Sequence, residues 1–274
     1  MRIWNLLCAS AIGAGLAAVA WGDWNPGDPY KMQRPMLPDE TQSGRGVVAS
    51  YVADPNNPGQ PVFNKIIADD WRCSETGPIT DIHIWGSWLY DTTDPQAVFY
   101  LSIYTDSRPP NDYSRPGNLL KTYVFKPGEY NARIWNQNVQ EVFLDPNLST
   151  TQGYDNTIWQ YNFLISDPDP VIQQKDNIYW LAVQADVDPT AQALFGWKTA
   201  VKPLYEDVAV YGDNTGPGIT PPAWSLVYES TGQGQPPIFY DMAFIITTPE
   251  PQTYGLVAGL GLGVFGLARR FLRK

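Results

Sequence analysis

Hydrophobic and polar residues alternate with a period of two along most of the chain between residues 47 and 248. This period is typical of strands with one buried face, whereas amphipathic helices repeat every 3.6 residues. The alternation is strongest in Ile79–Trp88, Ala97–Thr105, Thr157–Ser166, Asn177–Ala185 and Ile238–Thr247. Weaker segments are Val47–Ala53, Val62–Ala68, Leu119–Phe125, Asn131–Trp135, Glu141–Leu144, Leu194–Lys198, Val208–Tyr211 and Trp224–Tyr228. The pattern predicts about a dozen short strands.

Clusters of Pro, Gly, Asn and Asp separate these segments, as in Asp54–Gly59, Arg108–Asp112 and Asp213–Gly218. These residue types favour turns, because their side chains fix or relax the local backbone. Short strands joined by such turns predict an all-β fold, an antiparallel β-sandwich of the jelly-roll kind. No repeat or internal boundary is evident, so we predict one sandwich domain over residues 46–247. An irregular lead-in over residues 21–45 precedes it.

The N-terminal end has the three parts of a secretory signal. Arg2 supplies the positive charge, Leu6–Ala20 is apolar, and Ala18 and Ala20 form a small-x-small cleavage site. We predict a signal peptide over residues 1–20 that signal peptidase removes. The alternative is a buried core helix.

The C-terminal end has the pattern of a membrane-spanning helix with a stop-transfer signal. Gly255–Ala268 contains no charged or strongly polar residue, and a basic cluster of Arg269, Arg270, Arg273 and Lys274 follows it. Basic residues after an apolar span stay in the cytoplasm, so the pattern predicts an inner-membrane anchor with its domain outside.

The tripeptide Pro249-Glu250-Pro251, the apolar stretch and the basic end together resemble the PEP-CTERM sorting signal of bacterial proteins. The resemblance covers residues 248–274. It implies that the protease exosortase recognises Pro249, Glu250 and Pro251 and removes the tail. The protein would then be exported, held transiently in the inner membrane, and released to the cell surface or extracellular matrix. The alternative is a plain single-pass anchor.

The middle of the chain carries a second resemblance. Ile67–Cys73 and Thr76–Trp88 are similar to the core of an uncharacterised β-rich domain common in secreted PEP-CTERM proteins. The resemblance covers roughly residues 30–245, and it implies an extracellular sandwich without an established activity.

The amino-acid composition excludes several classes of function. One His and two Cys cannot build a zinc finger, a multi-His metal site or a disulfide framework. The net charge of −10 argues against nucleic-acid binding. Removal of residues 1–20 and of the apolar and basic end after the tripeptide takes away five basic residues and no acidic residue, which makes the mature charge about −15.

No catalytic residue stands out. His83 is the only imidazole and lies in a predicted strand, so we interpret it as a strand histidine hydrogen-bonded to a neighbour. Cys73 is predicted to be buried and inert, with an intermolecular disulfide as the minor alternative. We predict that the protein is not an enzyme. A glycan hydrolase that uses two carboxylates is the alternative.

Oxygen-rich loops raise the question of calcium. The pairs Asp167/Asp169 and Asp186/Asp188 have the residue types that bind Ca²⁺ in secreted sandwiches. Asp is also an ordinary turn former, and no complete EF-hand spacing is present. We therefore predict no cofactor, with a structural Ca²⁺ as the alternative.

The aromatic residues make up 14% of the chain and are the remaining candidates for function. Sugar rings stack on exposed Trp and Tyr faces, and Trp85, Trp88, Tyr100 and Tyr104 lie opposite the clearest aliphatic stripes. Two hypotheses follow. The first is a non-enzymatic surface or matrix protein associated with exopolysaccharide or biofilm. The second is a carbohydrate-binding module for extracellular glycan.

Overall fold

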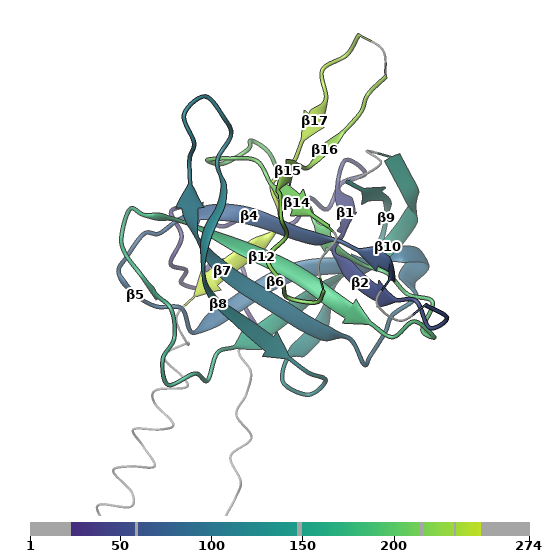
Figure 1. The fold of residues 1–274 in the computed structure, drawn as a ribbon, viewed down its shortest axis with the longest axis horizontal. Coiled ribbons are helices and arrows are strands. Elements are labelled where there is room, and N and C mark those ends of the chain that lie inside the picture. The colour runs from purple at the N-terminus through teal and green to yellow at the C-terminus, as the bar shows by residue number, and fades with distance from the viewer. Residues whose placement is uncertain (1–22, 58–59, 147–149, 214–215, 233, 248–274) are drawn as a thin grey trace, which may run out of the picture. The chain divides into compact units, whose positions relative to one another are not determined.

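The computed structural model describes residues 23–57, 60–146, 150–213, 216–232 and 234–247, and its regular elements in these ranges are strands and one 3-10 turn, η1 (Leu89–Asp91) (Figure 1). The predicted all-β class is thus confirmed. The strands are β1 (Arg45–Val48), β2 (Ser50–Ala53), β3 (Pro61–Asn64), β4 (Ile66–Arg72), β5 (Gly77–Pro78), β6 (Asp81–Trp88), β7 (Val98–Ser107), β8 (Arg115–Phe125), β9 (Asn131–Asp145), β10 (Thr150–Leu164), β11 (Ile172–Gln173), β12 (Ile178–Val187), β13 (Phe195–Lys198), β14 (Val210–Gly212), β15 (Ser225–Leu226), β16 (Tyr228–Glu229), β17 (Ile238–Phe239) and β18 (Phe244–Thr247).

Two large sheets enclose the main core in a sandwich-like arrangement. The first has the order β10-β9-β1-β13-β6-β18, and the second runs β15-β14-β4-β12-β2-β3, with β7 paired to β12 and β8 to β7. In Figure 1 the strands β4, β12 and β7 cross over β6. Phe99 of β7 joins the sheets, because its ring lies 5.4 Å from that of Phe163 and 5.0 Å from that of Phe195. Burial of such rings is the main force that holds the two layers together.

Two strand pairs correct the prediction of a purely antiparallel sandwich. β1 pairs with β9 in parallel, and β2 pairs with β12 in parallel. β1 and β2 are consecutive pieces of one extended run that leaves the first sheet at Ala49 and enters the second. A run that crosses between sheets in this way lacks a hairpin partner, so its direction is set by long-range pairing.

The first sheet closes on itself. β10 pairs with β6 as well as with β9, so β6, β10, β9, β1 and β13 form a closed ring of hydrogen-bonded strands. Closure leaves these five strands with few free edges, which stabilises the sheet against slipping and edge-to-edge association.

The described part of the lead-in, residues 23–44, is irregular and packs on the first sheet. Trp24 is 3% exposed, and its ring meets that of Trp85 edge-on at 5.9 Å. Glu40 accepts hydrogen bonds from the Trp135 indole at 2.6 Å and from the Asn136 amide at 2.5 Å. The segment is therefore part of the folded domain.

The strand boundaries differ from prediction where the sheets bend. Asn131–Trp135 and Glu141–Leu144 belong to a single strand, β9, which follows β10 through several register shifts. Such bulges keep a strand paired while its side chains change face, which interrupts the period-two pattern. Ile238–Thr247 is instead divided into β17, which pairs with β16, and β18, which pairs with β6.

The predicted signal peptide (1–20) and sorting signal (248–274) lie outside the described residues. Within the part of the chain that the structure describes, no helix has the length and apolarity needed to cross a membrane.

Candidate functional site

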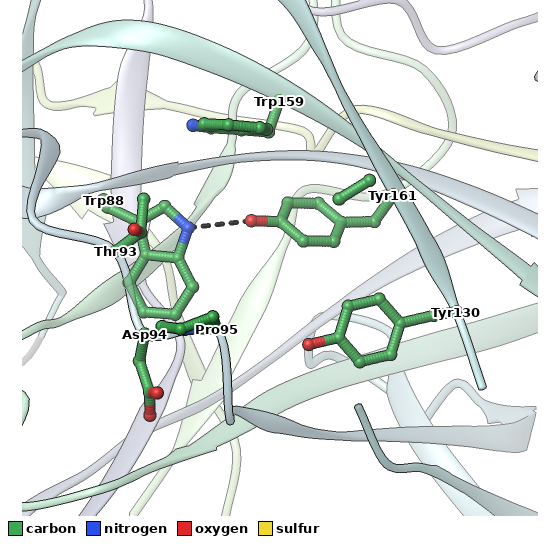
Figure 2. Close-up of a pocket in the computed structure, with 8 residues that line it drawn as sticks. Trp88, Thr93, Asp94, Pro95, Tyr130, Trp159 and Tyr161 are labelled. Carbon is green, nitrogen blue, oxygen red and sulfur yellow. Dashed lines mark hydrogen bonds between the residues drawn. The ribbon is translucent and has the colours of Figure 1, made fainter. Parts of the chain in front are cut away.

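An aromatic pocket opens beside the end of β6 (Figure 2). Its volume is about 240 Å³. The lining comes from the end of β6, the loop after η1, the start of β9 and the middle of β10: Trp88, Thr93, Asp94, Pro95, Tyr130, Ala132, Trp159 and Tyr161. Trp88 and Tyr161 form the buried floor, while Trp159 and Tyr130 are half-buried walls.

Strand periodicity brings these rings together. Trp159 and Tyr161 are two residues apart on β10, so both side chains project from the same face. The neighbouring β9 places Ala132 directly opposite Tyr161. Because alanine is small, this pairing leaves an open space in front of the Tyr161 ring.

Hydrogen bonds fix the orientation of two of the rings. The Trp88 indole Nε1 donates to the Tyr161 hydroxyl at 2.7 Å, which Figure 2 shows as a dashed line. The Tyr130 hydroxyl donates to the Ala97 carbonyl at 3.0 Å. Burial raises the pKa of Tyr130 to about 12 and raises that of Tyr161 as well. Both phenols therefore stay neutral at physiological pH and act as hydrogen-bonding groups.

Asp94 is the only carboxylate among the described residues that line the pocket, and its oxygens are already engaged. One oxygen accepts the Gln96 N–H at 2.8 Å, and the other accepts the Asp188 N–H at 2.9 Å. The side chain is 4% exposed. Asp94 thus holds the loop that carries Thr93 and Pro95 against the pocket.

The structure places the four predicted glycan contacts in different surroundings. Trp88 is in the pocket, and Tyr100 is half-buried against Gly218. Trp85 and Tyr104 have no exposed surface, which corrects the expectation that their rings face outward. The lead-in covers Trp85, and the Trp224 ring packs edge-on against Tyr104 at 6.0 Å.

Sequence reasoning missed Tyr130, Trp159 and Tyr161 as pocket residues. The signal was present in part, because the alternation places Trp159 and Tyr161 on one face of a strand. It also missed a pair of exposed rings, Tyr90 at 55% and Tyr154 at 46% exposure, whose centroids lie 5.3 Å apart.

His83 and Cys73 are both buried, in surroundings that match the sequence interpretation. His83 Nδ1 lies 2.6 Å from the Asn162 side-chain oxygen, and Nε2 lies 3.3 Å from the Thr247 hydroxyl. Cys73 has no disulfide partner among the described residues, and its thiol donates to the Glu75 carbonyl at 2.8 Å. Burial raises the pKa of this thiol, which lowers its reactivity.

The candidate calcium ligands make turn contacts. The Asp167 carboxylate accepts the Asp169 N–H at 2.9 Å and pairs with Lys121 at 2.5 Å. The Asp188 carboxylate accepts the N–H of Thr190 at 2.7 Å, and Asp186 is half-buried at the end of β12. In the described residues, no three His, Cys, Asp or Glu side chains are grouped so that they could hold a metal ion.

Comparison with known proteins gives one family. Residues 30–247 match the model of a domain of unknown function, DUF7901. No curated protein and no solved structure matches the chain. Because the match extends over most of the sequence and over both large sheets, the protein belongs to the DUF7901 family.

Proposed function

We propose that the protein is a non-enzymatic extracellular protein that binds one ring of a surface or matrix polysaccharide in the aromatic pocket. The observation that carries this proposal is the pocket itself, in which four aromatic side chains surround one small open space. Sugar rings present apolar C–H faces that stack on aromatic rings, together with hydroxyls that need hydrogen-bond partners.

The size and polarity of the pocket fit a single ring. Its volume of about 240 Å³ is smaller than the roughly 300–1,000 Å³ of pockets for drug-sized ligands. Trp159 is the accessible stacking wall, and the Tyr161 hydroxyl supplies a polar group at the floor. The indole of Trp88 already occupies one lone pair of that hydroxyl, so its proton is directed to another acceptor.

The arrangement favours binding over hydrolysis. Glycosidases of the usual kind need two carboxyl groups about 5–9.5 Å apart across the scissile bond. The pocket offers Asp94 alone, and backbone N–H groups occupy both of its oxygens. The hydrolase alternative therefore has no support at this site.

Trp159→Ala tests the binding proposal. We expect at least a tenfold loss of affinity for the matrix polysaccharide, about 1.4 kcal/mol, because the stacking wall is removed. Trp135→Ala is the matched control, since Trp135 is a half-buried tryptophan on β9 that does not line the pocket. Polysaccharide co-sedimentation measures binding, and thermal melting confirms folding. Unchanged binding by folded Trp159→Ala protein would contradict the proposal.

We further propose that the chain reaches the cell surface by way of its two ends. The signal peptide directs export, and exosortase processes the inner-membrane precursor at Pro249-Glu250-Pro251. The sequence resemblance supports this route. The acidic composition of the mature domain also favours solubility outside the cell.

Glu250→Ala tests the sorting route in cells. We expect the precursor to remain uncleaved in the membrane fraction, because the acidic recognition residue is lost. Gln252→Ala, just outside the tripeptide, is the control and is expected to be processed normally. Fractionation and immunoblotting detect both forms. Normal processing of the Glu250→Ala chain would exclude exosortase recognition of the tripeptide.

A further inference from the structure

Four polar side chains meet where the strands of the closed ring come together. Lys198 lies on β13, Glu141 on β9, Asp155 on β10 and Ser87 on β6, and each is at most 1% exposed. Lys198 Nζ contacts Glu141 Oε2 and lies 3.9 Å from Asp155 Oδ1. The Ser87 hydroxyl donates to Asp155 Oδ2 at 2.9 Å. An amine and two carboxyl groups are thus buried together.

Glycines on and just before β1 allow this meeting. β1 lies between β9 and β13, with Gly46 opposite Lys198 on one side and opposite Phe143 on the other. A side chain at Gly46 would clash, since its Cβ would lie 2.7 Å from the Ser87 hydroxyl. A Cβ at Gly44 would collide with the Glu141 carboxylate. The space above the central strand is therefore filled by the Lys198 and Glu141 side chains.

The charges of this cluster are poorly solvated. Apart from the contact between Lys198 Nζ and Glu141 Oε2, no hydrogen bond within the described residues reaches Lys198 Nζ, the Glu141 oxygens or Asp155 Oδ1, although an ammonium carries three donors. Burial lowers the pKa of Lys198 well below its ordinary value. Burial also raises the pKa of Asp155 to about 7, against the opposing hydrogen bond from Ser87. Proton transfer within the Lys198–Glu141 pair gives a neutral amine beside a neutral acid, which a dry interior favours.

We propose that Lys198 and Glu141 condense to an intramolecular amide bond, with Asp155 as the proton carrier. The lone pair of the Lys198 amine forms the new N–C bond with the Glu141 carboxyl carbon. The C–O bond to the carboxyl hydroxyl breaks, and that hydroxyl leaves with the Asp155 proton as water. Asp155 then takes the surplus proton from the nitrogen, so it is regenerated. One amine and one carboxylic acid give one amide and one water, without an oxidant or co-reactant.

Burial of Lys198 and Glu141 favours formation of the amide over the separate amine and acid. The amide replaces two groups whose charged forms are costly to keep away from water. Contact between Lys198 Nζ and the Glu141 carboxyl group also removes most of the entropic barrier of a bimolecular reaction. The product ties β9 to β13 across β1 through a covalent link.

Peptide mapping of the full chain tests the bond. The chain is expressed and folds in the cell, and it is then purified under denaturing conditions. Trypsin should release Ile134–Lys175, which contains Glu141 and Asp155, and should cut after Lys198 only if that amine is free. We expect Ile134–Lys175 to be joined to an uncut peptide that spans Lys198, with a mass one water below their sum. Recovery of unlinked Ile134–Lys175 together with Asp176–Lys198 as the main products would overturn the proposal.

Two variants assign the roles. Lys198→Met is expected to yield only unlinked peptides, because the nucleophile is absent. Asp155→Asn keeps the shape and both reacting groups, and we expect at least a tenfold loss of cross-linked product. A wild-type yield in Asp155→Asn would refute Asp155 as the proton carrier. Because mass spectrometry reads the bond itself, the result for the wild-type chain does not depend on whether a variant folds.

Discussion

The double variant Lys198→Met/Glu141→Leu is expected to melt about 10 °C below the wild-type protein. The amide between these residues closes a loop of about 57 residues. Closing a loop of that length lowers the conformational entropy of the unfolded chain, which stabilises the fold by about 4 kcal/mol. In a domain of 150–250 residues, each kcal/mol shifts the melting temperature by roughly 2–4 °C. Calorimetry of the two proteins at the same pH measures the difference.

The sign of this effect separates a covalent link from an ion pair. Replacing both members of a buried ion pair by apolar residues of similar size is often neutral or stabilising by about 1–4 kcal/mol. Removing an amide cross-link instead frees the unfolded chain and lowers stability. An unchanged or raised melting temperature would therefore contradict the amide.

A single replacement provides the control. Glu141→Leu leaves the Lys198 amine buried without its partner, which for a charged pair costs about 3–5 kcal/mol. This loss is expected with or without the cross-link, so it shows that the site responds to substitution. Only the double variant distinguishes the two states of the pair.

The predicted strands and the observed sheets agree where the information is local. The predicted strand Ile79–Trp88 differs from the observed β6 only at its first two residues, because alternation along eight residues is enough to define a strand. The direction of β1 and β2 depends instead on partners far along the chain, in β9 and β12. The periodicity of the sequence does not predict the pairing of β1 with β9 or of β2 with β12.

The sites were harder to predict for the same reason. Trp85 alternates as an outward-facing residue would, yet the lead-in that covers it is irregular and has no period of its own. Lys198, Glu141 and Asp155 are charged residues in or beside strands, a pattern typical of solvent-facing positions. Only the closed register of the ring brings the three together, so their chemistry is invisible before the fold is known.

A second group of buried acids predicts how stability depends on pH. Asp69 and Asp70 of β4 are fully buried, and Asp241, before β18, is 2% exposed. Asp69 accepts the Met242 N–H at 2.5 Å, and Asp241 accepts the Tyr205 N–H at 2.5 Å. Asp70 Oδ2 and Asp241 Oδ1 have no partner in the described residues. Burial, with repulsion among the neighbouring carboxylates, raises the pKa of Asp69 and Asp70 and raises that of Asp241 to about 7.

Raised pKa values make the folded protein most stable in mild acid. The folded state holds protons that the unfolded chain releases near pH 4, so stability falls as the pH rises toward the folded pKa. For Asp241 alone the loss between about pH 5 and pH 8 is on the order of 3 kcal/mol. Below about pH 4 the trend reverses, because hydrogen bonds hold the pKa of exposed acids such as Asp112 and Asp188 below its ordinary value.

Asp241→Asn should flatten this decline and make the protein more stable than wild type at pH 8. The amide keeps an oxygen that can accept the Tyr205 N–H, and it carries no charge to bury. A smaller slope remains, because burial also raises the pKa values of Asp69, Asp70 and Asp155. These acids therefore also lower the stability as the pH rises. Asp112→Asn is the control, since this exposed acid is ionised throughout the window and its loss leaves the slope unchanged. Melting temperatures from pH 5 to pH 8 measure each slope, and an equal slope in wild type and Asp241→Asn would show that Asp241 does not hold the proton.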